Sequence, residues 1–205
     1  MAMKILVVKG SPRKQGNSSI LADELAESAR KTGAEVATIR LHGLSIAPCR
    51  GCEHCHQVKV GECVTKDDMQ SLYPKVLEAQ AIVYAGPIYW FTISAQLKLF
   101  IDRCYSLNAA SDSDPEAPSF LAGKKIVGLF TYGDDDPLTS GVANAAGMLR
   151  DMCRYAGAEL VGIAHGTAGA AGEVRENAAL LERVRELGKT LAAFGRRAGG
   201  RGRTR

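Results

Sequence analysis

Residues 10–19, close to the N-terminus, combine several side chains that can bind a phosphate group. They follow an apolar run at residues 5–8 and precede apolar residues at helical spacing, so they join a strand to a helix. The free N–H groups and the dipole of a helix N-terminus attract anions. Hydroxyls, an amide and a guanidinium add further donors. The candidate phosphate ligands are Ser11, Arg13, Asn17, Ser18 and Ser19.

This segment matches neither of two common nucleotide-binding patterns. It lacks the G-x-G-x-x-G of dinucleotide sites and the Gly-Lys-Ser/Thr of a Walker A loop, which favours a ligand with a single phosphate. The simpler alternative is an ordinary strand-to-helix loop in which Asn17 or Ser18 only caps the helix. The density of donors favours phosphate.

Aromatic side chains follow another apolar run, at residues 81–85. The segment 87–91 reads Pro-Ile-Tyr-Trp-Phe, and flat apolar groups at a strand end suit a planar heterocycle. Alternatively, these aromatics cover the core or form an oligomer contact. Together with a phosphate site at a neighbouring strand end, they favour a mononucleotide such as FMN.

Four cysteines form a C-x2-C-x2-C-x7-C pattern at Cys49, Cys52, Cys55 and Cys63. Such spacing in a cytosolic chain indicates a metal site rather than disulfides, and three thiolates at two-residue gaps can hold three corners of a [4Fe–4S] cubane. The alternatives are zinc, whose finger sites usually separate the pairs more widely, and four reduced thiols or an adventitious disulfide.

Other residues near or beyond this pattern are expected to stay outside the metal site. His54 and His56 are expected to be solvated, while Cys104 and Cys153 fall on apolar helix faces and are expected to be buried, inert thiols.

The elements that must position these groups alternate along the chain. We predict strands at residues 3–9, 36–39, 81–85, 126–130 and 159–163, and helices at about 17–32, 93–104, 139–155 and 173–194. A further helix is expected to start at Thr65 as N-cap. This order implies an α/β fold with a doubly wound parallel five-stranded sheet and helices on both faces. Ligands then bind beyond the carboxyl ends of the strands.

Composition bounds the remaining possibilities. At 205 residues, one domain is expected over 1–195, with the cysteine-rich loop at 42–65. The net charge of +4 comes from residues 196–205, which carry five arginines and no acid and are expected to form a disordered tail. The body is near neutral, so nucleic acid is not an expected partner. No run is long enough to span a membrane and no signal peptide is evident, which favours the cytoplasm.

Combined, the motifs resemble the NADPH-dependent FMN reductase branch of flavodoxin-like proteins. The resemblance rests on Gly10-Ser11-Pro12-Arg13, Gly16-Asn17-Ser18, Gly86-Pro87-Ile88-Tyr89-Trp90, Lys98 and Ile101-Asp102-Arg103. It implies strand order 2-1-3-4-5 and FMN, with phosphate on the residues given above. It also implies that the isoalloxazine ring lies against Pro87, Ile88, Tyr89 and Trp90, with Thr131, Tyr132 and Gly133 on its other flank.

The cysteine pattern resembles the iron–sulfur flavoprotein subgroup, which carries FMN and a [4Fe–4S] cluster, although the last gap is longer here. The leading hypothesis is a flavin-dependent oxidoreductase with NAD(P)H as a possible donor and small-molecule or protein redox partners. The alternatives are an NAD(P)H-dependent FMN or quinone reductase without a cluster, a non-enzymatic electron carrier and a zinc-stapled module. Exposed aromatics such as Trp90 and Phe91 favour a homo-oligomer, a dimer or tetramer.

Overall fold

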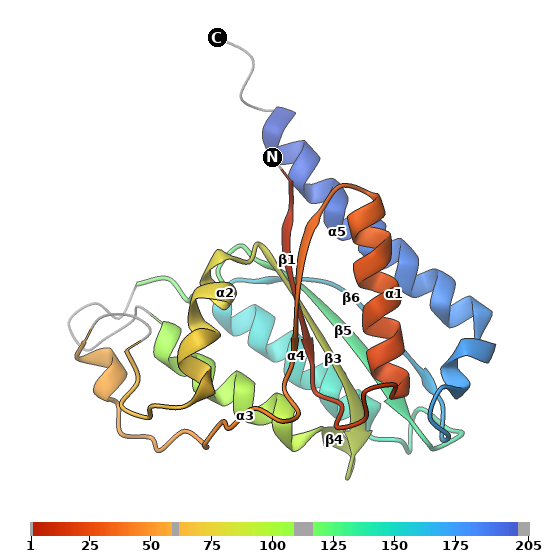
Figure 1. Ribbon diagram of the computed structural model, residues 1–205, viewed down its shortest axis with the longest axis horizontal. Coiled ribbons are helices and arrows are strands. Elements are labelled where there is room, and N and C mark those ends of the chain that lie inside the picture. The colour runs from red at the N-terminus through yellow and green to blue at the C-terminus, as the bar shows by residue number, and fades with distance from the viewer. Residues whose placement is uncertain (1, 59–61, 109–116, 201–205) are drawn as a thin grey trace.

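The computed structural model describes residues 2–58, 62–108 and 117–200 and shows a parallel sheet between two layers of helices (Figure 1). Five strands pair in parallel: β1 (Lys4–Lys9), β2 (Glu35–Arg40), β3 (Ala81–Tyr89), β5 (Lys125–Tyr132) and β6 (Glu159–Thr167). Their spatial order is β2-β1-β3-β5-β6, which is the expected order 2-1-3-4-5 once the parallel strands alone are counted. A short strand, β4 (Thr92–Ile93), pairs antiparallel with β3 outside this path.

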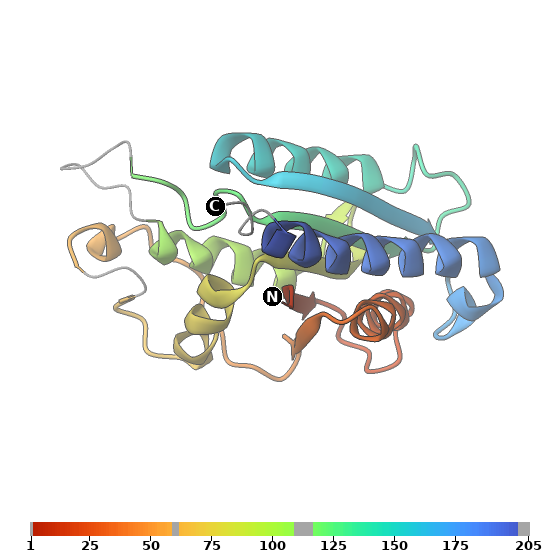
Figure 2. The ribbon, with the colours of Figure 1, turned by 90° about the horizontal axis from the view of Figure 1, so that it is seen from above.

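The helices divide between the two faces of the sheet. One face packs against α1 (Asn17–Lys31) and α5 (Ala178–Gly200). The other packs against α2 (Tyr73–Glu78), α3 (Ala95–Arg103) and α4 (Val142–Ala156). Figure 2 shows α4 and α5 on opposite sides of β6. The described residues also form four 3₁₀ turns: η1 (His54–His56), η2 (Asp68–Ser71), η3 (Cys104–Leu107) and η4 (Glu173–Glu176).

Alternation along each strand builds the two cores. In β1, Leu6 and Val8 face the α3–α4 side, whereas Ile5 and Val7 face the α1–α5 side. Because side chains alternate across a strand and both faces are covered, an unbroken apolar run is buried on both sides. This double burial explains why apolar runs located the strands in the sequence.

Three strands continue further than the apolar runs indicated. β3 extends through Pro87 to Tyr89, whereas the sequence placed the strand end at Ala85. The pairing of β1 with β3 ends at Lys9 and Ala85. Beyond this point β3 has a parallel neighbour on one side only, and therefore tolerates a proline. Similarly, β5 ends at Tyr132 and β6 at Thr167.

Two element boundaries differ from the sequence prediction. Thr65 is not the N-cap of the helix that follows it. Instead, the Asp67 carboxylate accepts the Met69 N–H at 3.1 Å and caps η2, and α2 begins separately at Tyr73. At the other end of the chain, α5 runs to Gly200, so the helix includes the first part of the segment expected as a disordered tail. Residues 201–205 lie outside the described residues.

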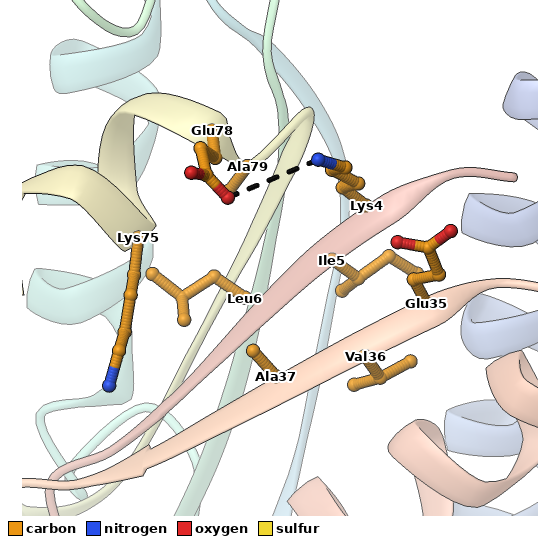
Figure 3. Close-up of a pocket in the computed structure, with 9 residues that line it drawn as sticks. All are labelled: Lys4, Ile5, Leu6, Glu35, Val36, Ala37, Lys75, Glu78 and Ala79. Carbon is orange, nitrogen blue, oxygen red and sulfur yellow. Dashed lines mark ion pairs between the residues drawn. The ribbon is translucent and has the colours of Figure 1, made fainter.

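A depression of about 290 Å³ lies over β1, β2 and α2, where Lys4 and Glu78 form an ion pair at 3.9 Å (Figure 3). Its lining includes Lys4 and Glu35, which begin their strands, so it lies at the amino ends, whereas ligands of such sheets bind at the carboxyl ends. The functional site is therefore expected at the opposite edge of the sheet. Within the described part of the chain, no helix is long and apolar enough to cross a membrane.

Candidate functional site

The carboxyl ends of the strands meet at one edge of the sheet and surround a pocket of about 130 Å³, here called the flavin pocket. Ten of the twelve residues predicted to bind cofactor line it: Ser11, Arg13, Asn17, Ser18, Pro87, Ile88, Tyr89, Thr131, Tyr132 and Gly133. They come from three separate strand ends. The two remaining residues, Ser19 and Trp90, are not among its lining residues.

The first wall of the pocket is the N-terminus of α1. Gly16 is its N-cap residue, and the first N–H groups of a helix have no acceptor within the helix. The Ser18 hydroxyl is buried and has no hydrogen-bond partner among the residues that the structure describes. A buried hydroxyl without a partner costs about 1–3 kcal/mol, so this group fits a ligand that accepts its hydrogen bond. The N-terminus of α1 is thus equipped for an anion.

The loop before α1, residues 10–16, is here called the cradle, and it has no room for a larger residue at Gly16. A Cβ atom added at Gly16 would lie 2.5 Å from Ser11 Oγ and 3.2 Å from the Arg13 carbonyl oxygen. Ser11 accepts a hydrogen bond from the Arg13 N–H at 3.2 Å, which holds the loop in a tight turn. Ser19 donates to the Arg13 carbonyl at 3.4 Å and so supports the loop from outside the pocket. A glycine at position 16 therefore keeps the cradle open.

The Asn17 side chain, which the sequence predicted as a phosphate ligand, is held by other hydrogen bonds. Its Nδ2 donates to the carbonyls of Ala168 and Ala170, at 3.1 and 2.8 Å, and its Oδ1 accepts the N–H groups of Gly172 and Val174. An asparagine amide has two donor hydrogens and an acceptor oxygen with two lone pairs, so these four bonds occupy it fully. The side chain anchors the loop after β6, and only the backbone N–H of Asn17 is left for a ligand.

The second wall is a hairpin that joins β3 to β4. Trp90 and Phe91 form its two-residue loop and have φ angles of 47° and 64°. Two successive residues in the left-handed region define a type I′ turn, which suits the twist of a hairpin but strains residues other than Gly, Asn and Asp. The hairpin exposes 90% of Trp90 and 45% of Tyr89. Strain and exposed aromatics in one turn indicate a contact surface.

The hairpin is fixed by close contact with the start of α4. The Asn144 amide donates to the Phe91 carbonyl at 2.8 Å. Gly141 has a φ of 83°, and a Cβ atom added there would lie 2.3 Å from the Phe91 Cα. Only a glycine allows the two backbones to approach this closely. Gly141 therefore sets the position of the second wall.

The third wall comes from the end of β5. Thr131 and Tyr132 are buried, and the Tyr132 hydroxyl lies 2.9 Å from His165 Nδ1 on the neighbouring β6. Burial raises the pKa of Tyr132, with the nearby Asp136 and Asp134 acting in the same direction. Burial also lowers the pKa of His165, as does Arg183. Both shifts favour the neutral forms, so this wall presents a neutral hydrogen-bonded pair.

Sequence reasoning missed three lining residues: Gly16, Ala168 and Gly169. Gly16 belongs to the phosphate-binding segment, but it contributes backbone rather than a side chain. Ala168 and Gly169 follow β6, and a run of small residues after the last predicted strand is the signal that could have identified them. Small residues at a strand end allow close approach of a ligand to the backbone.

The four cysteines of the predicted metal site line a second, small cavity of about 30 Å³. Cys49 and Cys52 are exposed, whereas Cys55 and Cys63 are half-buried. We call this the cysteine cavity. It shares no lining residue with the flavin pocket, and Figure 1 shows the segment after β2 far to the left of the strand ends. The two cavities are therefore separate within the part of the chain that the structure describes.

Arg103, at the end of α3, holds the cysteine loop against the body. Its guanidinium is 1% exposed and forms a two-pronged ion pair with Asp67, at 2.5 and 3.2 Å. It also donates to the Ala47 carbonyl at 2.9 Å and to Cys63 Sγ at 3.5 Å. Burial lowers the pKa of Arg103, but the hydrogen bonds to Asp67 and Tyr73 raise it by a larger amount. The guanidinium therefore keeps its positive charge.

The sulfur atoms influence one another electrostatically. Burial raises the pKa of Cys55, and the neighbouring thiols of Cys63, Cys49 and Cys52 add to this increase. For Cys63, burial acts upward, but the Thr65 backbone N–H and the Arg103 guanidinium outweigh it and lower the pKa. Cys63 therefore loses its proton more readily than Cys55.

No three His, Cys, Asp or Glu side chains converge on a single metal ion within residues 2–58, 62–108 and 117–200. A single ion needs ligands that meet at one point, whereas a [4Fe–4S] cubane takes one thiolate at each of four irons. The described residues therefore show four cysteines around one cavity, but no assembled metal site.

The remaining candidates near the cysteines do not join the cavity lining. His54 is exposed, as expected, but His56 is half-buried with its ring 4.5 Å from that of Tyr105, so the expectation of a solvated side chain is wrong for His56. Cys104 and Cys153 are buried as predicted, and burial raises the pKa of both, that of Cys153 to about 11. Such thiols are unreactive near neutral pH.

This fold, with a cradle at the first strand end and flat walls at the next two, defines a flavodoxin-like flavoprotein. The family profile described as NADPH-dependent FMN reductase matches residues 3–172. The chain belongs to this family.

Similar proteins agree with this assignment. An iron-sulfur flavoprotein of Archaeoglobus fulgidus is 40% identical over 101 residues, which are 49% of this chain and 45% of that protein. The match thus spans about half the length of that relative. An iron-sulfur flavoprotein of Methanocaldococcus jannaschii is 28% identical over 93% of this chain and 96% of its own length. The NAD(P)H:quinone oxidoreductase of Methanothermobacter marburgensis shares the fold, with a TM-score of 0.71 at 17% identity over 93% of this chain and 98% of that one.

Proposed function

We propose that this chain is a cytoplasmic NAD(P)H:acceptor oxidoreductase that binds FMN in the flavin pocket and a [4Fe–4S] cluster in the cysteine cavity. The observation that supports the flavin site most directly is the unpartnered Ser18 hydroxyl at the N-terminus of α1. When bound, FMN supplies the redox chemistry, taking up a hydride from a nicotinamide and passing electrons to an acceptor. The protein supplies binding and orientation.

In this proposal, each wall binds a different part of the cofactor. Ser18, the first N–H groups of α1 and the Arg13 guanidinium hold the phosphate, while Pro87, Ile88 and Tyr89 contact the flat ring. The pocket of about 130 Å³ is smaller than the roughly 300–1,000 Å³ of typical ligand sites. The ring would therefore contact the exposed hairpin in addition to the pocket.

Trp90 lies at the tip of that hairpin rather than in the pocket. Together with Phe91, which is 56% exposed, it presents an apolar surface that water covers poorly. The proposed role of this surface is a contact within a homo-oligomer. Sedimentation of the wild type and of Trp90→Ser tests it, since only a true contact residue changes the oligomeric state.

FMN affinity should follow the geometry of the cradle. Arg13→Ala is expected to weaken FMN binding by about 1.5–3 kcal/mol, because a charged partner of the phosphate is lost, and Ser18→Ala by about 0.5–1.5 kcal/mol. Titration of FMN into the apoprotein, followed by flavin fluorescence, measures both. Lys14→Ala serves as the control, because this neighbour does not line the pocket. Equal affinity in all three variants contradicts the proposed phosphate site.

The cluster proposal is supported by the four cysteines around one cavity and by the lowered pKa of Cys63. It is also consistent with relatives named iron-sulfur flavoproteins. Each thiolate must be deprotonated to bind iron, so a permanent cation beside Cys63 favours ligation. The cluster would receive electrons from a flavin and pass them to an acceptor one at a time.

Cys55→Ser is expected to abolish cluster content and leave FMN bound, since the two cavities share no lining residue. Anaerobic purification with assays of iron and acid-labile sulfide measures the cluster, and absorbance after heat release measures FMN. Cys153→Ala is the control, because this thiol is buried away from the cavity. Fewer than about two irons per wild-type chain would rule out a full cubane.

Measurement of NAD(P)H oxidation distinguishes the proposed enzyme from an electron carrier and from a reductase without a cluster. The purified protein should oxidise NADH or NADPH in the presence of an artificial acceptor, and a simple electron carrier would not. A cluster-free reductase would oxidise the nicotinamide with equal rates in wild type and Cys55→Ser. That result would retain the flavin enzyme and remove the cluster from the proposal.

A further inference from the structure

A second large cavity lies between α3 and α4, over the middle of β3, and measures about 340 Å³. Its walls come from β3, the α3–η3 segment, residues 119–121 and the last turn of α4. It shares no lining residue with the flavin pocket, but Cys49 and Tyr105 line both it and the cysteine cavity. We call it the α3–α4 cavity. Its volume is within the range of small-molecule sites.

The walls of the α3–α4 cavity suit a flat apolar molecule. Phe120, Tyr105 and Tyr155 provide aromatic surface, and Met152 provides a polarisable thioether that packs well against rings. Tyr155 is 91% exposed, an unusual position for a large aromatic side chain without a contact.

The electrostatics of the lining favour a neutral ligand. Among the lining residues that the structure describes, Asp102 is the only one with a charged side chain, and it already pairs with Lys98 at 2.5 Å. An anion would meet this carboxylate with no cation among those lining residues to offset it. A cation would compete with Lys98 for the same carboxylate. The cavity therefore offers no favourable partner to an anionic or a cationic ligand.

The floor of the cavity carries one unpartnered polar group. Tyr84 is 1% exposed, lines the cavity and makes no hydrogen bond to any residue in the described ranges. Burial, with the nearby thiols of Cys104 and Cys153, raises its pKa well above the usual value, so the phenol keeps its proton. Tyr84 is thus a hydroxyl donor in the lining of a mostly apolar cavity, and a few such polar groups fix the orientation of a ligand. A ligand with an acceptor oxygen suits it.

We propose that the α3–α4 cavity binds a small neutral aromatic molecule with a carbonyl oxygen, which accepts a hydrogen bond from Tyr84. The aromatic walls contact the ring, and the rim residues Tyr105 and Tyr155 close over it. The site is separate from the flavin pocket and requires neither cofactor. A ligand held there would lie beside the cysteine cavity, because Cys49 and Tyr105 contribute to both.

Calorimetric titration with 1-acetonaphthone, an aromatic ketone that is neither a redox partner nor an alkylating agent, tests the proposal. Wild-type protein should bind it with equal affinity with or without FMN. Tyr84→Phe, which removes a single oxygen atom, should bind roughly 2- to 10-fold more weakly. Ala156→Leu, which adds three carbons at the cavity wall, should lose binding. Ala143→Leu, the same change on the exposed side of α4, should bind as wild type does.

Several outcomes would overturn the site. Absence of binding to the wild type refutes it, as does unchanged affinity in both Tyr84→Phe and Ala156→Leu. Displacement of the ketone by FMN would place the probe in the flavin pocket instead. If Ala156→Leu fails to fold, as judged by circular dichroism, the Tyr84→Phe titration decides alone. None of these readouts depends on iron content or turnover, so they remain separate from the tests of the proposed function.

Discussion

Replacing Arg103 with methionine is expected to lower the free energy of unfolding by about 3–5 kcal/mol. The change leaves the Asp67 carboxylate, whose side chain is 8% exposed, without its ion-pair partner. It also removes the donors that join the Ala47 and Thr65 carbonyls and the Cys63 sulfur to α3. Urea unfolding monitored by circular dichroism measures the loss. Limited proteolysis should then cut the cysteine loop before the rest of the protein.

Two further variants show whether the fork of hydrogen bonds or the charge matters. Arg103→Lys keeps the charge without the planar fork, so it should recover only part of the lost stability. Arg154→Met removes an arginine whose ion pair with Asp151 is exposed, and should change stability by less than about 1 kcal/mol. If Arg103→Met and Arg154→Met were equally stable, the buried pair would not be what fastens the cysteine loop.

Gly141→Ala is expected to destabilise the protein by on the order of 3 kcal/mol, from left-handed backbone strain and overpacking combined. The φ of 83° disfavours alanine, and the new Cβ would meet the Phe91 backbone, which cannot move aside as a side-chain end could. The hairpin must therefore shift away from α4. Thermal and urea unfolding measure the cost, and the fluorescence of Trp90, the single tryptophan, reports on the hairpin.

Gly147→Ala, within α4, is a control for which the expected change in stability has the opposite sign. Nothing lies within 4 Å of its would-be Cβ, and its φ is not in the left-handed region. Alanine in a helix interior is better than glycine by roughly 0.5–1 kcal/mol, so this variant should be more stable than wild type. A Gly141→Ala protein as stable as Gly147→Ala would show that the hairpin adapts without cost.

The sequence was informative wherever one physical cause dominated. Apolar runs such as residues 5–8 are buried on both faces of a parallel sheet, so they identified the strands. The spatial order of the strands came instead from the family resemblance. The run at 81–85 gave the wrong strand end, because the pairing of β3 with β5 continues to Pro87. That pairing depends on residues more than 40 positions away along the chain and leaves no local signal.

For the candidate site as well, the residue types predicted some features and failed to predict others. Residue types located the flavin pocket, since donors and aromatics collect at strand ends for chemical reasons. They did not show how side chains divide their roles: Asn17 anchors a distant loop, and Trp90 lies at the tip of a strained turn. Both roles arise from tertiary contacts or backbone angles that the residue type alone does not specify. The ion pair between Asp67 and Arg103 was missed for the same reason.

The hydrogen bonds of Asn17 also impose an order on the biogenesis of the protein. Their partners lie 151 to 157 residues further along the chain. A ribosome therefore releases the N-terminus of α1 long before it releases the loop that immobilises it, and contacts of such long sequence separation form late in folding. A nascent chain that ends before residue 168 has the glycines and serines of the cradle but not its anchor. The cradle is therefore expected to become rigid only after most of the chain has been synthesised.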